Sequence, residues 1–256
     1  MESVDLVQNT TVATTTTTIN QYGQEIGVGL PDWKPAQSPQ RIVLDGQYCR
    51  LEPLIADQHA VELYEAFQAG TNPDKTWTYM ANGPFNTYES YYDIVKTVFE
   101  VTKDPMHFAV IDKQTNKAVG TIAFIRIDPK NGSIEVGSVV FSALLKRTRQ
   151  SSEAVFLLMK YAFDQLGYRR FEWKCDSLNE LSRKAADRYG FTFEGTFRQA
   201  IVYKGRNRDT NWYSILDSEY NARIRAAFVQ WLDPNNFGAD GQQVCRLSDL
   251  TKAQLL

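Results

Sequence analysis

The stretch that decides the fold reads Ile134-Glu135-Val136-Gly137-Ser138-Val139-Val140-Phe141 and continues, after a short loop, as Lys146-Arg147-Thr148-Arg149-Gln150-Ser151-Ser152-Glu153-Ala154. The first run has the β-branched and aromatic composition of a strand. The second opens a helix with apolar residues at helical spacing, which Gly167 ends. Arg170–Cys175 follows as a buried-strand candidate, so the order strand, helix, strand predicts a parallel crossover.

The segments on either side predict an α/β fold with a mixed sheet. Three β-rich segments separated by short turns, Met106–Asp112, Ala118–Asp128 and Ser133–Phe141, favour an antiparallel meander. Two helices are expected before the meander, capped by Asp57 and Thr87. The other expected elements are a helix over 179–189 with Leu181, Ala185 and Ala186 inward, strands over Phe191–Arg198 and Asn211–Ile215, and a helix over 218–232.

Composition divides the chain into three regions. Residues 1–40 contain five consecutive threonines and regularly spaced prolines but little apolar material, which predicts a mostly disordered arm. Residues 41–220 carry the strand and helix patterns and are expected to form one domain. Residues 221–256 are expected to add a C-terminal helix and a tail.

Charge and cysteine content exclude several classes of protein. A formal net charge of -2, from 28 Lys and Arg against 30 Asp and Glu, argues against nucleic-acid and anionic-membrane partners. Three separated cysteines suggest neither a disulfide framework nor a metal site. No run approaches the ~20 apolar residues of a membrane helix, and the N-terminus lacks a secretory signal pattern. We therefore expect a cytoplasmic protein.

The junction between the strand that ends at Phe141 and the helix that follows carries binding chemistry. A helix N-terminus presents unpaired N–H groups and positive potential. Lys146, Arg147 and Arg149 stand beside it, so the junction suits a phosphate or pyrophosphate. The alternative interpretation is that these cations are ordinary solvated surface charges.

Taken together, these motifs resemble the GNAT family of acetyl-CoA-dependent N-acetyltransferases, and more narrowly its ribosomal-protein-alanine N-acetyltransferase branch. The segments that carry the resemblance are Glu135–Ala154, Leu166–Lys174, Asn179–Phe191 and Gly205–Thr210. The resemblance implies a mixed, mostly antiparallel sheet whose central parallel pair splays apart, flanked by helices. It also implies acetyl-CoA as co-substrate and no metal.

The resemblance assigns the coenzyme contacts. The expected contacts are Val139, Val140 and Phe141 on the strand, Lys146, Arg147, Thr148, Arg149, Gln150, Ser151 and Ser152 at the helix start, and Asn179 on the next helix. The family loop reads Gln/Arg-x-x-Gly-x-Gly/Ala, and here Lys146, Arg149 and Ser151 hold its named positions, so the glycines are missing. A bulge beside Gly137 is expected to aim a backbone N–H of Ser138 or Val139 at the oxyanion.

Two residues are the expected catalytic groups. Glu135 is expected to take a proton from the acceptor amine, because such amines are mostly protonated at neutral pH. Its alternative role is the polar half of a strand alternation. The family's tyrosine acid falls at Ala186 and is absent, so Ser182 is the expected substitute. Alternatively, Asn179 or Ser182 only caps the helix.

Aromatic residues between the first two helices are the expected acceptor wall. Trp77, Tyr79 and Phe85 suit an apolar or aromatic substrate or a peptide terminus, although core packing explains the same residues equally well. The run Lys204–Thr210 is interpreted as a hairpin turn in which Asp209 offsets a neighbouring arginine.

The sequence therefore predicts direct transfer of an acetyl group from acetyl-CoA to a primary amine, on a peptide N-terminus or a small molecule. The alternative is a module that binds CoA or a peptide with little catalysis, since the tyrosine and the loop glycines are missing. A third reading, RNA binding through the basic residues, predicts a salt-sensitive affinity that CoA does not displace.

Overall fold

The structure is a computed structural model that describes residues 17–253, and the chain divides into two compact units, Met1–Lys34 and Pro35–Leu256. In the first unit, β1 (Thr17–Ile19) pairs antiparallel with β2 (Glu25–Gly27). This exposed hairpin lies within the region that the sequence predicts to be a disordered arm. Residues 1–16, with part of the threonine run, lie outside the described residues.

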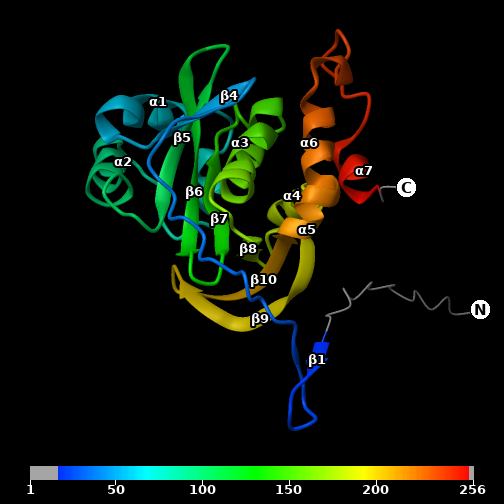
Figure 1. Cartoon of the computed structure of the whole chain (residues 1–256). Coiled ribbons are helices and arrows are strands. Elements are labelled where there is room, and N and C mark those ends of the chain that lie inside the picture. Colours follow the sequence, from blue (N-terminus) through cyan, green and yellow to red (C-terminus); the bar gives the residue numbers. More distant parts are fainter. Residues whose placement is uncertain (1–16, 254–256) are drawn as a thin grey trace, which may run out of the picture. The chain divides into compact units, whose positions relative to one another are not determined.

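An eight-stranded sheet organises the second unit (Figure 1). Its order is β3-β4-β5-β6-β7-β8-β10-β9, and every neighbouring pair is antiparallel except β7 and β8. The strands are β3 (Leu44–Asp45), β4 (Cys49–Pro53), β5 (Met106–Asp112), β6 (Lys117–Asp128), β7 (Ser133–Phe141), β8 (Arg170–Asp176), β9 (Thr192–Tyr203) and β10 (Arg206–Leu216). The predicted mixed, mostly antiparallel sheet with one central parallel pair is confirmed.

Helices cover both faces of the sheet. α1 (Ala56–Gln68) and α2 (Tyr88–Ile94) pack on one face, and α3 (Arg149–Lys160) and α6 (Arg225–Leu232) on the other (Figure 1). The remaining helical segments are η1 (Pro73–Trp77), η2 (Val95–Phe99), η3 (Tyr161–Gln165), α4 (Glu180–Arg188), α5 (Asp217–Glu219), η4 (Tyr220–Ile224), η5 (Pro234–Asn236) and α7 (Leu247–Lys252).

Alternation along the strands assigns each side chain to one of two hydrophobic layers. Phe108 packs in the layer of α3 and α6, where Phe156 and Phe228 stack with ring centroids 4.8 Å apart. Ala109 faces the opposite way, into the layer that contains Leu63 of α1. Because both faces of β5 are covered, this strand is apolar at nearly every position.

The parallel pair separates partway along its length. β7 and β8 pair only as far as Val136 and Trp173. Beyond that point β7 continues as Gly137–Phe141 against β6, and β8 continues as Lys174–Asp176 against β10. The facing edges of these two stretches, which we call the split, are therefore not joined to each other. The predicted splay of the central pair is confirmed.

A β-bulge bends β7 inside the split. The register against β6 shifts between Gly137 and Val140, so Ser138 and Val139 together oppose Ile122. Ser138 has a φ of 47°, in the left-handed region that non-glycine residues seldom adopt. The bulge that the sequence predicts beside Gly137 is present.

Three details differ from the sequence-based expectations. Asp57 does not cap α1: Ile55 holds the N-cap position, and the Asp57 carboxylate accepts hydrogen bonds from α2 and η2. Leu181, expected to face inward, is 73% exposed, because α4 is short and buries only a narrow stripe around Ala186. β9 and β10 are longer than expected, since their ladder extends to the turn between Tyr203 and Arg206.

The second unit takes in segments that the sequence assigned to the arm and to the C-terminal tail. The Ala36 N–H donates to the carbonyl of Pro129 in the β6–β7 turn. The Tyr48 hydroxyl donates to the carbonyl of Leu232 at the end of α6. These contacts tie residues 35–40 and the C-terminal helices to the core of the same unit.

Candidate active site

The split exposes backbone groups along the β7 edge. Val140 is buried, and Val139 and Phe141 are half-buried beside it. Backbone N–H and C=O groups that lack a neighbouring strand need other partners, and an extended ligand with amide groups supplies them. The structure thus places the three predicted strand contacts together at the split.

The N-terminus of α3 follows β7 after a short loop. Thr148 is its N-cap: Oγ1 accepts from the Ser151 N–H at 3.2 Å, and the Ser151 hydroxyl donates back to the Thr148 carbonyl at 2.7 Å. The exposed Arg147 before it has a φ of 64°. A helix start leaves four N–H groups without helical partners, and the Thr148 cap occupies one of them.

Two predicted coenzyme contacts in this turn have protein partners. The Gln150 amide donates to Asp112 Oδ1 at 3.0 Å, and the Ser152 hydroxyl accepts from Arg188 at 2.9 Å. These bonds tie the first turn of α3 to the β5–β6 hairpin and to the end of α4. Both side chains therefore hold the helix start in position.

Arg149, which takes the place of the family's first loop glycine, is also engaged. Its guanidinium lies 4.1 Å from the ring centroid of Phe237 and 5.1 Å from that of Tyr48. Phe237 belongs to the C-terminal segment and packs edge-to-face on Trp231. The C-terminal segment thus steadies the same helix turn.

Lys146 and Lys75 bring two positive charges to the loop before α3. Lys146 Nζ donates to Thr76 Oγ1 at 3.0 Å. Burial, with a further contribution from the nearby positive charge of Lys75, lowers the pKa of Lys146. A polyanion would relieve this repulsion. Sequence reasoning identified Lys146 but missed Lys75, which is brought near it only by the fold.

An open hollow of about 260 Å³ lies against this turn. It is lined by Leu144, Leu145, Thr148 and Gln150 of the loop and helix start, and by Asp112, Thr115, Lys117 and Val119 of the β5–β6 hairpin. The start of α3 is therefore open on this side.

Glu135 is buried at 2% exposure on β7 and is held by two cations. Its Oε2 lies 2.5 Å from Arg126 Nη1 and 2.9 Å from Lys174 Nζ. The Lys174 ammonium also lies 3.6 Å from the ring centroid of Trp212. The predicted base is thus part of an ion-pair network that spans β6, β7 and β8.

The network continues along β8 to the edge of the sheet. Glu172 lies 2.6 Å from Lys174 Nζ and 2.6 Å from Arg170 Nε. Arg170 also binds Glu194 of β9, and this hydrogen bond lowers the pKa of Glu194. Because positive and negative side chains alternate along this network, the buried charges on this face of the sheet beside the split compensate one another.

Ser182 and Asn179 occupy the start of α4. The Asn179 side chain caps the helix, since its Oδ1 accepts from the Ser182 N–H at 3.2 Å. The Ser182 hydroxyl accepts from Trp173 Nε1 at 3.0 Å. Asn179 therefore acts as the helix cap, as the alternative interpretation expected. Ser182 is instead hydrogen-bonded to Trp173, the last β8 residue that pairs with β7 before the split.

The three residues of the predicted acceptor wall lie in two different surroundings. Trp77 is 6% exposed and packs edge-to-face against Phe67 and Phe85. Gly83, at a φ of 70°, lies so close to the Trp77 ring that a side chain there would clash with it. Tyr79 is different: its hydroxyl donates to the Leu178 carbonyl in the β8–α4 turn. Only Tyr79 of the three joins the turn that follows β8.

The tip of the β9–β10 hairpin binds the same loop. Lys204 Nζ donates to the Trp77 carbonyl at 2.8 Å, and Arg206 donates to the Thr78 carbonyl at 2.7 Å. The expectation that Asp209 offsets Arg206 or Arg208 is wrong, because its Oδ1 instead accepts from Gln199 and Asn207. The hairpin tip is therefore hydrogen-bonded to the loop of the predicted acceptor wall.

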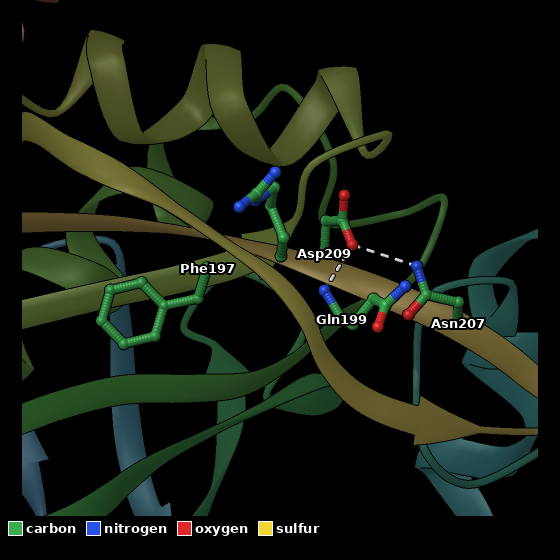
Figure 2. Close-up of a pocket in the computed structure, with 5 residues that line it drawn as sticks. Phe197, Gln199, Asn207 and Asp209 are labelled. Atoms are coloured by element: carbon green, nitrogen blue, oxygen red, sulfur yellow. Dashed lines mark hydrogen bonds between the residues drawn. The ribbon is translucent and has the colours of Figure 1, made fainter.

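Asp209 also lines an open hollow of about 740 Å³. Figure 2 shows the Gln199 backbone and the Asn207 amide converging on its carboxylate. Those bonds stabilise a bulge in β9, where Gln199 has a φ of 49°. Phe197 and Arg198 complete the lining, so the hollow belongs to β9 and β10 alone and contains no residue of the split.

The two histidines, His59 and His107, and the cysteine of β8 are buried in the protein core. Cys175 is buried, and burial raises the pKa of its thiol. Within residues 17–253, no group of three potential metal ligands converges. No helix in that range is both long and apolar enough to cross a bilayer.

Comparison with known proteins identifies the class to which this fold and site belong. The model of the acetyltransferase (GNAT) domain matches residues 49–192, from β4 to the start of β9. The chain belongs to the GNAT family, whose members are acetyltransferases, and the family predicted from the sequence is confirmed.

Individual relatives are named acetyltransferases as well. A GCN5-related N-acetyltransferase from Brucella melitensis has 44% identity and a TM-score of 0.83, covering 88% of this chain and all of that chain. The uncharacterised N-acetyltransferase p20 of Bacillus licheniformis is 31% identical over 60% of this chain and 86% of its own length. A ribosomal-protein-serine acetyltransferase of Escherichia coli is 29% identical over 64% of this chain and 92% of its own length.

Proposed function

We propose that this protein transfers an acetyl group from acetyl-CoA to a primary amine, on a protein N-terminus or a small molecule, in one direct step. The observation that carries the proposal is the split, where β7 and β8 stop pairing although both strands continue. The pantetheine arm of CoA is extended and contains amides, so it fits an edge that lacks a neighbouring strand.

The start of α3 supports the same ligand at its other end. Helix N–H groups, together with Lys146 and Lys75, form a positive region at the end of the loop that leaves β7. A diphosphate there would compensate the repulsion between the two lysines. The backbone and these lysines replace the missing loop glycines as the candidate diphosphate contacts.

Several groups around the split suit acetyl transfer. Acetyl-CoA, when bound, supplies the acetyl group as a reactive thioester. The bulge at Ser138 and Val139 turns backbone N–H groups locally, and a donor aimed at the thioester oxygen would stabilise the negative charge that develops on it. The walls at Tyr79 and Arg206 would hold the acceptor close, and proximity supplies much of the rate gain.

The name of one relative favours a protein acceptor over a small amine. The Escherichia coli relative is named for acetylation of a ribosomal protein at serine. β9 is exposed at most of its positions, and an exposed strand suits an extended chain as acceptor. The acceptor panel should therefore include peptides that begin with Ser or Ala beside small amines.

Calorimetry and a thiol-release assay test the proposal together. At 100 times its Kd, acetyl-CoA should stabilise the fold by ~2.7 kcal/mol and raise the Tm by several degrees. Thiol release should then depend on an acceptor from the panel. Binding without acceptor-dependent release would favour the weakly catalytic CoA-binding module, and absence of binding would reject both functions.

A further inference from the structure

A second buried carboxylate lies at the split and differs from Glu135 in its partners. Asp176 is the last residue of β8 and is 5% exposed. Side chains alternate along a strand, so Asp176 points to the same face as Lys174 and Glu172 and thus as Glu135. Within residues 17–253, Asp176 forms no ion pair, whereas Glu135 forms two.

This difference matters for proton transfer. When Glu135 takes up a proton, it loses its ion pairs with the half-exposed Arg126 and with the buried Lys174, which is costly although Lys174 keeps its pair with Glu172. Asp176 has neutral partners: Oδ1 accepts from the Leu178 N–H at 2.9 Å, and Oδ2 accepts from the Tyr203 hydroxyl at 2.8 Å. Protonation of Asp176 therefore breaks no ion pair among the described residues, and the nearest arginines to its Tyr203 partner, Arg206 and Arg208, lie 5.3 and 5.9 Å from the Tyr203 ring centroid.

Tyr203 connects this carboxylate to the acceptor side of the split. It is the last residue of β9, beside Lys204 and Arg206, which hold the loop of the predicted acceptor wall. Its single proton points to Asp176, so its oxygen keeps lone pairs that accept another proton. Burial, then the hydrogen bond from Tyr203 to Asp176, raises the pKa of Tyr203 to about 12, so the hydroxyl stays protonated at neutral pH.

We propose that Tyr203 takes the proton from the attacking amine and passes its own proton to Asp176. The acceptor arrives as an ammonium, so the Tyr203 oxygen first accepts one of its protons while Asp176 Oδ2 receives the Tyr203 proton. The nitrogen lone pair that is freed then bonds to the acetyl carbon, and the nitrogen's second proton leaves to solvent. Solvent protonates the sulfur when the carbon–sulfur bond breaks, and Asp176 later returns its proton to solvent through Tyr203. Tyr203 is then the catalytic residue, Asp176 its proton acceptor, and Glu135 a member of the structural ion-pair network. This inference rests on the proposed function.

Two substitutions test the relay. Tyr203→Phe removes only the hydroxyl, and Asp176→Asn keeps an oxygen that accepts from Leu178. The matched control is Tyr213→Phe on neighbouring β10, which removes a buried hydroxyl bonded to Asn211. We expect kcat/KM for a peptide or alkylamine acceptor to fall about 100-fold in both test variants, a typical contribution of acid–base catalysis, and to stay unchanged in the control.

Two further measurements separate a proton-transfer role from a structural one. Hydroxylamine is mostly unprotonated at neutral pH, so its acetylation should suffer far less than that of an alkylamine. The calorimetric Kd for acetyl-CoA should stay at the wild-type value in all variants. In a ¹³C-tyrosine NMR titration, the Tyr203 resonance should titrate near pH 12 in the wild type and at lower pH in Asp176→Asn, where the carboxylate is absent.

The outcomes distinguish this inference from the proposed function. If wild-type protein binds acetyl-CoA and turns over, but Tyr203→Phe is fully active while Glu135→Gln is not, only the relay is overturned. Equal losses with hydroxylamine and alkylamine, or a weakened acetyl-CoA Kd, would also overturn it in favour of a structural role. Wild-type protein without binding or turnover would overturn the proposed function and the relay with it.

Discussion

The two halves of β7 have similar composition but different neighbours. Ser133–Val136 lies between β6 and β8 and is bonded on both edges. Gly137–Phe141 is bonded only to β6 and is bent by the bulge at Ser138. One strand thus serves as sheet interior in its first half and as an open edge in its second.

A sheet divided in this way can offer backbone groups to a ligand without losing its fold. The closed half anchors the strand through residues such as Ile134, which is fully buried. The open half is supported from behind by β6, so its free edge stays extended. Stability and binding should therefore respond to different substitutions along the same strand.

The largest expected effect comes from weakening the closed half. Ile134→Ala should lower the free energy of unfolding by about 2–5 kcal/mol, because it removes a buried side chain and leaves a cavity. Val139→Ala in the open half should cost about 1 kcal/mol, since Val139 is half-buried. Urea denaturation measures both. Equal costs would contradict the division of β7 into a structural and a binding half.

Hydrogen exchange can distinguish the two halves of β7 without any substitution. Saturating acetyl-CoA at 100 times its Kd should slow exchange by up to about 100-fold for amides of Gly137–Phe141 and Lys174–Asp176. Amides of Ser133–Val136 already have strand partners and should change less. Mass spectrometry of peptic fragments resolves the two halves. Uniform protection of β7 would show that the split is not the binding edge.

A pH titration of the unfolding free energy tests the sheet away from the split, through the buried His107 of β5. His107 is buried on β5, and burial, with a further contribution from Arg41, lowers its pKa from 6.5 to about 4. Between those values the unfolded chain binds a proton that the folded chain does not, so stability is lost as pH falls from 6.5 to 4. The loss should reach roughly 2–3 kcal/mol.

His107→Phe keeps a ring beside Phe99 and removes the titrating group. Unfolding free energies measured across that window should then fall less in the variant than in the wild type, and the remaining loss comes from carboxylates with a lowered pKa such as Glu194. The Kd for acetyl-CoA should be unchanged, since His107 lies two strands from the split. If the variant loses as much unfolding free energy between pH 6.5 and 4 as the wild type, the loss belongs to groups other than His107.

The smallest expected effect concerns the diphosphate end. Lys146→Gln should weaken acetyl-CoA binding about fivefold to tenfold, because it removes one partly exposed charge-assisted contact. The matched control is Lys113→Gln, an exposed lysine on the β5–β6 hairpin that pairs with Asp45. Calorimetry at two salt concentrations measures the difference. Equal weakening in both variants would indicate a general charge effect.

The sequence predicts most of the fold because its local signals are strong. Met106–Asp112 and Ser133–Phe141 match the observed strands at both ends, since turn residues bracket continuous β-rich runs. Thr87 and its helix were identified by the capping pattern. Leu181 was misplaced because a helix period alone does not say how wide a stripe the neighbours cover.

The site was predicted less completely because its contacts join distant parts of the chain. Glu135 stood out as an acid in a strand, but its cations come from β6 and β8. Tyr203 gave no signal, since it lies beyond the expected end of its strand at Arg198 and meets Asp176 only through the strand order. The local sequence pattern determines where helices and strands form, whereas the order of the strands in the sheet determines which distant side chains come into contact.

The position of β10 also governs when this domain can be completed during synthesis. β10 is the last strand to leave the ribosome among the described residues, yet it lies inside the sheet, between β8 and β9. Until it emerges, the outer edge of β8 has no neighbour and β9 has nothing to pair with. A nascent chain halted before Arg206 therefore displays Arg170–Asp176 as a bare template for intermolecular strand pairing, so premature termination here yields an aggregation-prone fragment rather than a smaller enzyme.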